Sequence, residues 1–199
     1  MKVVEILFYD GNRVKLVVEM PDPSCYSTKH APHIPQLLFK LFPHLARHRC
    51  DNDNGFTFRR ECKSTEIPHL FEHLIIELQG QAQRSGILKG ETQWNWRVDP
   101  KGRFHVYVDY ENETLVLGAI RVAERIIQAL DGRRIEQIDV DEEVKELRKL
   151  AQIGDLLRNG IHSHPEPRGE TVELHPAREL TALGGSTESE GEPRDQGTE

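Results

Sequence analysis

The segment His69-Leu70-Phe71-Glu72-His73 brings together three side chains that can do chemistry. On a helix, residues four apart lie on one face, so His69 and His73 would project side by side. Two imidazoles in that arrangement can bind one zinc ion. Glu72, one residue before the second histidine, would lie close to the metal without having to be a ligand. The spacing therefore predicts a zinc site with a carboxylate base beside it.

The surrounding sequence predicts the helix that this site needs. Apolar residues recur at three- and four-residue steps from Ile67 to Leu78, which is helical spacing. Ser64 or Thr65 can cap its start, and Pro68 lies in the first turn, where a missing N–H does no harm. The pattern is the His-x-x-Glu-His of inverted zinc peptidases, in which the glutamate is the general base. Histidine and glutamate are common on helix surfaces, so the pattern also occurs by chance. Here, however, these polar side chains lie beside the apolar faces of the helix, and burying them without partners would cost free energy, which favours a functional role.

A catalytic zinc ion takes a third protein ligand and keeps one position open for water. Three carboxylates are candidates: Glu113 near the start of a later helix, Asp109 on the strand before it, and Glu77 one turn beyond His73. A ligand from a separate element closes a three-sided site better than a third residue of the same helix. We therefore favour Glu113, then Asp109. Glu77 could instead orient a histidine from behind, or be a solvated surface acid.

Arg97 is the candidate for holding the substrate. Its guanidinium could bind an oxyanion or a substrate carboxylate through two parallel hydrogen bonds. An ion pair beside Trp94 and Trp96 explains the same residue equally well. His48, at a predicted helix end, could contact substrate, although a histidine there is more often a cap or a surface residue.

The composition describes a protein with one domain and a tail. Of the 199 residues, 37% are hydrophobic and 30% charged, as in soluble proteins. No apolar run is long enough to cross a membrane, and the N-terminus enters strand-like sequence at once, so we expect no signal peptide. The three cysteines are irregularly spaced, which indicates a reducing compartment and a cytoplasmic protein.

The net charge of −7 is concentrated near the C-terminus. Residues 160–199 contain nine acidic side chains and three arginines, among many Pro, Gly, Ser and Thr residues. Such a composition buries too little apolar surface to fold, so we expect a disordered acidic tail after a domain at 1–159. The domain itself is close to neutral, which gives no reason to expect a nucleic-acid partner. The oligomeric state stays open.

The domain is predicted to be α+β, with small antiparallel sheet regions packed against about four helices. Two hairpins are indicated, each with a polar turn between strand-like segments. The expected strands are residues 3–9, 14–20, 94–98 and 103–110. The expected helices are residues 36–47 with a break at Pro43, the motif helix ending near 83–86, 115–130 and 141–157. Residues 56–60 could be a strand or a loop.

Three segments then occur in a characteristic order. They are Leu41-Phe42-Pro43-His44-Leu45-Ala46-Arg47-His48-Arg49-Cys50, then Gly55-Phe56, then His69-Leu70-Phe71-Glu72-His73-Leu74-Ile75-Ile76-Glu77-Leu78-Gln79. They resemble the N-terminal domain of cyanophycin synthetase, which has a leucine-proline stretch ending in His-x-Cys, a Gly-Phe turn, and His-x-x-Glu-His followed by x-x-x-Glu-Leu-Gln. The resemblance extends over about residues 30–157, the whole apparent fold.

The resemblance implies less than the activity of the whole enzyme. Cyanophycin synthetase polymerises aspartate and arginine with ATP, using an ATP-grasp domain and a Mur-ligase-like domain. This chain has neither, and no G-x-x-x-x-G-K-[ST] loop, so we do not expect an ATP-dependent synthetase. In the family, the N-terminal domain can bind the polymer. In some members the His-x-x-Glu-His residues cut it into primers.

The expected function is therefore a zinc-dependent hydrolase of amide bonds in a peptide or an aspartate/arginine polymer. Zn²⁺ would be held by His69, His73 and Glu113, with Glu72 as the base that activates water. The alternative is a binding module that holds a polymer or a partner protein without cutting it.

Overall fold

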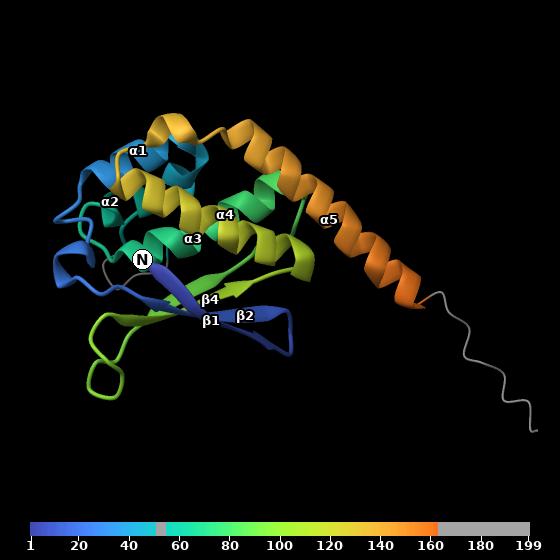
Figure 1. The fold of residues 1–199 in the computed structure, drawn as a ribbon, viewed down its shortest axis with the longest axis horizontal. Coiled ribbons are helices and arrows are strands. Elements are labelled where there is room, and N and C mark those ends of the chain that lie inside the picture. The colour runs from blue at the N-terminus through green and yellow to red at the C-terminus, as the bar shows by residue number, and fades with distance from the viewer. Residues whose placement is uncertain (51–54, 163–199) are drawn as a thin grey trace, which may run out of the picture. The chain divides into compact units, whose positions relative to one another are not determined.

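The computed structural model describes residues 1–50 and 55–162 (Figure 1). In these residues, four strands form one antiparallel sheet in the order β1-β2-β4-β3. The strands are β1 (Lys2–Tyr9), β2 (Arg13–Glu19), β3 (Gly90–Gln93) and β4 (Arg103–Asp109). β2 and β4 form its centre. Alternate side chains are buried along β4 and at Val14, Leu16 and Val18 of β2, as the period of a strand requires, and Val17 is buried as well. The β3 strand is an edge.

Five α-helices lie in the described part of the chain, all on one side of the sheet (Figure 1). They are α1 (His33–Leu41), α2 (Phe58–Glu61), α3 (Ile67–Ala82), α4 (Glu113–Asp131) and α5 (Val140–His162). Three short 3₁₀ segments lie in the connections, at Pro23–Cys25 before α1, Pro43–Arg47 after α1 and Ile135–Gln137 between α4 and α5. The predicted α+β class is confirmed, with one sheet in place of two separate hairpin regions. None of these helices is long and apolar enough to span a membrane.

α3, the motif helix, is the most deeply buried of the helices. It contacts β3 and β4 on one side and α4 and α5 on the other. Eleven of its sixteen residues are buried, including the polar Glu72, His73, Glu77 and Gln79. The prediction of a cap from Ser64 or Thr65 is wrong, because the N-cap residue is Glu66, which caps through no side-chain hydrogen bond. The hydroxyl of Thr65 contacts His69 instead.

Several predicted boundaries also need correction. The partner of β4 in the second hairpin is Gly90–Gln93 and not residues 94–98, because residues 95–99 turn on themselves through hydrogen bonds to the Asn95 carbonyl. Trp96 packs inward against Phe104, and its indole N–H donates to the Arg103 carbonyl. The break predicted at Pro43 is confirmed, since α1 ends at Leu41 and a 3₁₀ turn follows. Residues 58–61 are helical, and so are neither strand nor loop.

The last helix, α5, packs on α4 through a short buried face. Val144, Leu147 and Ala151 are buried, whereas Ile153 and Leu157 are about half exposed or more. The helix continues to His162, so it enters the segment that we expected to be tail. The rest of the predicted tail, 163–199, lies outside the described residues.

Candidate metal centre

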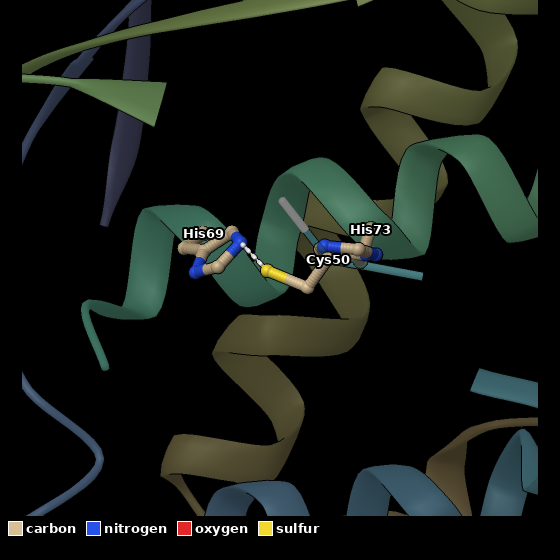
Figure 2. A group of neighbouring side chains, drawn as sticks. All are labelled: Cys50, His69 and His73. Atoms are coloured by element: carbon tan, nitrogen blue, oxygen red, sulfur yellow. Dashed lines mark hydrogen bonds between the residues drawn. The ribbon is translucent and has the colours of Figure 1, made fainter. Parts of the chain in front are cut away.

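The start of α3 and the segment before α2 bring three possible metal ligands together. One ligand atom each from Cys50, His69 and His73 lies within 4.8 Å of the others (Figure 2). His69 and His73 project from successive turns of α3, as predicted, and the Cys50 sulfur lies 3.4 Å from His69 Nε2. His73 is buried and the other two are half-buried. The predicted pair of histidines is therefore joined by a thiol, Cys50, that was not among the predicted ligands.

Each histidine of this cluster contacts a partner through Nδ1. The Thr65 hydroxyl lies 2.8 Å from His69 Nδ1. When this nitrogen carries the proton and donates to Thr65, the lone pair of Nε2 faces Cys50. Thr65 is held in turn by Thr28, whose hydroxyl donates to the Thr65 carbonyl and accepts from its N–H. This support fixes the ring that would bind the metal.

A longer chain of contacts supports His73. Its Nδ1 lies 3.1 Å from His48 Nδ1, and His48 Nε2 lies 2.8 Å from the Glu77 carboxylate. Glu77 also accepts a hydrogen bond of 2.6 Å from the Gln81 amide. The ring of Phe58 stacks on His73 with 3.7 Å between the ring centroids. Glu77 therefore contacts a histidine on the side away from the cluster, as one of the alternatives from the sequence requires. That histidine is His48, which in turn contacts His73.

The electrostatics of the cluster suit metal binding. Burial lowers the pKa of His69 to about 4. Burial, with His69 and His48 nearby, lowers the pKa of His73 to about 2. Both rings are consequently neutral near pH 7, and a neutral imidazole is the form that binds a metal ion.

Glu72 lies beside the cluster but faces the sheet. Its Oε1 is 4.0 Å from His73 Nε2, and its Oε2 accepts a 2.6 Å hydrogen bond from the Thr92 hydroxyl. Burial raises the pKa of Glu72 to about 7; Glu91 adds to the rise, while the Thr92 hydrogen bond and Arg13 oppose it. A carboxylate with a pKa near the working pH is suited to be a general base.

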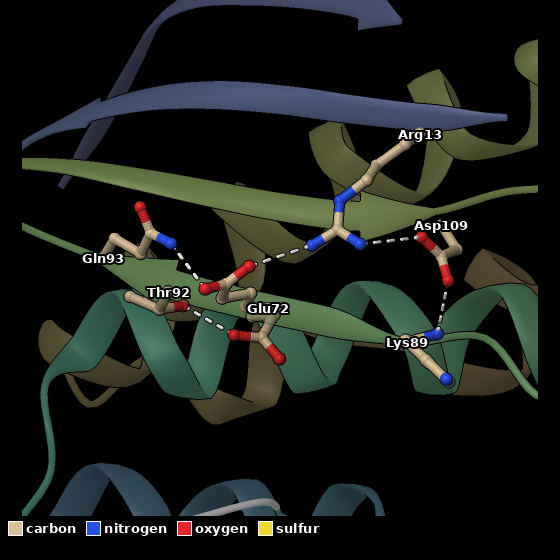
Figure 3. Close-up of polar contacts among 7 residues, drawn as sticks. Arg13, Glu72, Lys89, Thr92, Gln93 and Asp109 are labelled. Atoms are coloured by element: carbon tan, nitrogen blue, oxygen red, sulfur yellow. Dashed lines mark hydrogen bonds and ion pairs between the residues drawn. The ribbon is translucent and has the colours of Figure 1, made fainter. Parts of the chain in front are cut away.

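The other predicted site residues lie elsewhere. Glu113 begins α4 and accepts a long 3.4 Å hydrogen bond from the Tyr110 hydroxyl. Asp109 ends β4 and contacts Arg13 and the Lys89 N–H (Figure 3). Arg97 is exposed in the turn after β3, where its backbone N–H donates to the side-chain oxygen of Asn95. Within the described residues, neither Glu113, Asp109 nor Glu77 belongs to the cluster of Cys50 and the histidines.

The preference for Glu113 as third ligand stays a prediction, and the position of Glu113 relative to α3 argues against it. Gln79 donates a hydrogen bond to the Asp109 carbonyl, so the junction of β4 and α4 lies beside the second half of α3. Gln79 is ten residues beyond His69, or about 15 Å along a helix that rises 1.5 Å per residue. Cys50 could have been predicted from chemistry alone, since zinc favours thiolate ligands and Cys50 lies two residues after His48.

The donor set fits zinc. One sulfur and two imidazole nitrogens are ligands that zinc takes, and three protein ligands leave the open position of a catalytic site. Tetrahedral zinc with ordinary bond lengths separates its ligand atoms by roughly 3.5 Å. The 3.4 Å between Cys50 Sγ and His69 Nε2 is close to that value.

Fold and site together define a small α+β domain with a candidate Cys-His-His metal centre next to a buried glutamate. Residues 15–131, more than half of the chain, match the family of cyanophycin synthase-like N-terminal domains. The chain belongs to this family. Cys50, His69, Glu72 and His73 lie within the matched range. No curated protein matches the chain.

Proposed function

We propose that this protein is a zinc-dependent hydrolase of amide bonds in a peptide or a cyanophycin-like polymer of aspartate and arginine. One observation carries the proposal. Ligand atoms of Cys50, His69 and His73 lie within 4.8 Å of one another, and the carboxylate of Glu72 reaches to 4.0 Å from His73. Three ligands and an adjacent base are the parts that such a reaction needs.

The roles of the residues follow from their contacts. Cys50, His69 and His73 hold Zn²⁺, with Thr65 and His48 keeping the proton on the far nitrogen of each imidazole. When bound, zinc supplies the Lewis acidity that makes water a nucleophile near neutral pH. Glu72 accepts the proton of that water and returns it to the amide nitrogen that leaves.

The substrate class rests on the family and on Arg97. The exposed guanidinium of Arg97 lies in the turn that follows β3, and β3 contacts Glu72 through Thr92. We assign to Arg97 the binding of a substrate carboxylate, which a polymer of aspartate and arginine offers at its chain end.

The test combines metal analysis with an assay. The purified protein is analysed for zinc and incubated with a polymer of β-aspartyl-arginine, with ordinary peptides as control substrates. We expect about one zinc per chain and cleavage that a chelator removes and added zinc restores. His73→Ala should lose zinc and cleavage together. A zinc-loaded protein that binds the polymer but cuts no substrate would instead establish the non-catalytic binding module.

A further inference from the structure

Two residues of the edge strand β3 close on the carboxylate of Glu72. Gly90 pairs with Val108 and Thr92 pairs with Val106, so both lie on the face of the sheet that covers α3. Figure 3 shows the Thr92 side chain pointing at the Glu72 carboxylate, which it reaches at 2.6 Å. The carboxylate is thus held between a helix and a strand that are separate in the sequence.

The side chain of Glu72 occupies the space that a side chain at position 90 would need. A Cβ atom built on Gly90 would lie 2.4 Å from Glu72 Oε1, 2.6 Å from its Cγ and 2.7 Å from its Cδ. Real Cβ atoms essentially never approach other atoms so closely, and the backbone of Gly90 is not in the left-handed region. Any other residue here would therefore push the Glu72 side chain away, although its backbone could adopt the same conformation.

We infer that Gly90 and Thr92 are positioning residues that set the distance between the Glu72 carboxylate and the metal centre. The inference rests on the proposed function, because it gives the two residues a part in proton transfer. Thr92 binds Oε2, and Gly90 leaves room for Oε1 at 4.0 Å from His73 Nε2. A base that is misplaced by about 1 Å can lose two orders of magnitude in rate.

The strand that carries both residues is itself fixed from the outer face of the sheet. Arg13 forms ion pairs with Glu91 at 3.2 Å and with Asp109 at 3.5 Å. Asp109 also accepts from the Lys89 N–H at 3.1 Å, just before β3 begins (Figure 3). These contacts tie β3 to β2 and β4 and give Asp109 a structural place away from the metal ligands.

The activity test compares Gly90→Ala and Thr92→Val with matched variants. For Gly90→Ala we expect kcat to fall on the order of 100-fold. For Thr92→Val we expect a loss of about tenfold, since a hydrogen bond to a charged group is removed. KM and zinc content should stay unchanged in both. Thr92→Ser should recover most of kcat. Gly80→Ala, where the added Cβ meets only open space, is the glycine control.

A second readout needs neither zinc nor substrate. In the metal-free protein, Gly90→Ala should lower the free energy of unfolding, measured in urea. The same change in a Glu72→Ala background should cost much less, because that background lacks the Cγ, Cδ and Oε1 atoms that the new methyl group would meet. Equal losses in both backgrounds would overturn the close contact.

The outcomes separate this inference from the proposed function. Wild-type cleavage with unchanged kcat in Gly90→Ala and Thr92→Val would overturn the positioning role and leave the hydrolase intact. Gly90→Ala could cost less stability in the Glu72→Ala background while the wild type cleaves no substrate. That result would overturn the proposed hydrolase function and, with it, the role of the two residues in proton transfer. Loss of zinc in Gly90→Ala would also contradict the inference, because the inference places Gly90 next to the base Glu72 and not next to a metal ligand.

Discussion

His48 Nδ1 lies 3.1 Å from Nδ1 of His73, and the other ring nitrogen of His48 lies 2.8 Å from Glu77. Two ring nitrogens that meet in this way share one proton. If His48 donates to Glu77, its Nδ1 is an acceptor, and His73 must donate from Nδ1. The lone pair of His73 Nε2 is then available to a metal ion. Through His48, the buried carboxylate of Glu77 therefore sets the tautomer of His73, a proposed metal ligand.

The first prediction concerns His48. We expect His48→Leu to raise the Kd for zinc roughly tenfold to hundredfold, because His73 loses the acceptor that fixes its proton. His48→Gln should lose less, since an amide can still accept from His73 and donate to Glu77. The measurement is competition for zinc with a chelator, and His30→Leu, at an exposed histidine, is the control. Identical competition curves for wild type and His48→Leu would contradict the prediction.

The second prediction identifies the third ligand. Cys50→Ala should lose zinc, because two remaining ligands seldom hold it firmly. Glu113→Ala and Asp109→Ala should keep it, since both carboxylates contact other partners. Elemental analysis of the three variants decides the matter. Zinc retained in Cys50→Ala and lost in Glu113→Ala would restore the ligand set that the sequence had favoured.

The third prediction is a pH dependence of stability in the metal-free protein. Burial raises the pKa of Glu72 from about 4.5 to about 7, so the folded protein binds more protons than the unfolded chain between these values. The stability from this group is complete below pH 4.5 and is lost as the pH rises through 7. Relative to Glu72→Gln, the wild type should lose up to about 3 kcal/mol over this range. Urea unfolding at several pH values measures the difference, and parallel curves would contradict it.

The fourth prediction concerns the C-terminal segment. In the described residues the last buried side chain of α5 is Ala151, and Leu156 and Leu157 are exposed. A chain that ends at Asn159 should therefore unfold at nearly the wild-type temperature. Leu147→Ala, at a buried contact with α4, is the comparison and should cost about 2–5 kcal/mol. A large drop in the midpoint of the shortened chain would show that residues 160–199 pack on the domain.

The sequence predicted the parts of the site that depend on one helix. His69, Glu72 and His73 have the expected relation because helical spacing is local and determines which side chains share a face. The orientation of Glu72 toward β3 was not predictable in the same way. It depends on Gly90 and Thr92, whose strand had been expected several residues later in the chain.

Contacts between distant segments account for what was missed. Cys50 reaches His69 only because the turn after α1 carries the chain back over α3, and spacing in the sequence does not show such a return. Glu113 was favoured because it comes from a separate element, but α4 begins beside the far half of α3. Alternation also predicted a strand at 94–98, where Trp96 instead packs into the core from a turn.

The central claim is that zinc and Glu72 together hydrolyse an amide bond, and Glu72→Gln tests it most directly. Glutamine preserves the size of the side chain but cannot accept a proton from water, and Glu72 is not among the proposed ligands. We expect the variant to contain as much zinc as the wild type and to cleave the β-aspartyl-arginine polymer roughly 100- to 10,000-fold more slowly. Cleavage at the wild-type rate by zinc-loaded Glu72→Gln would contradict the account.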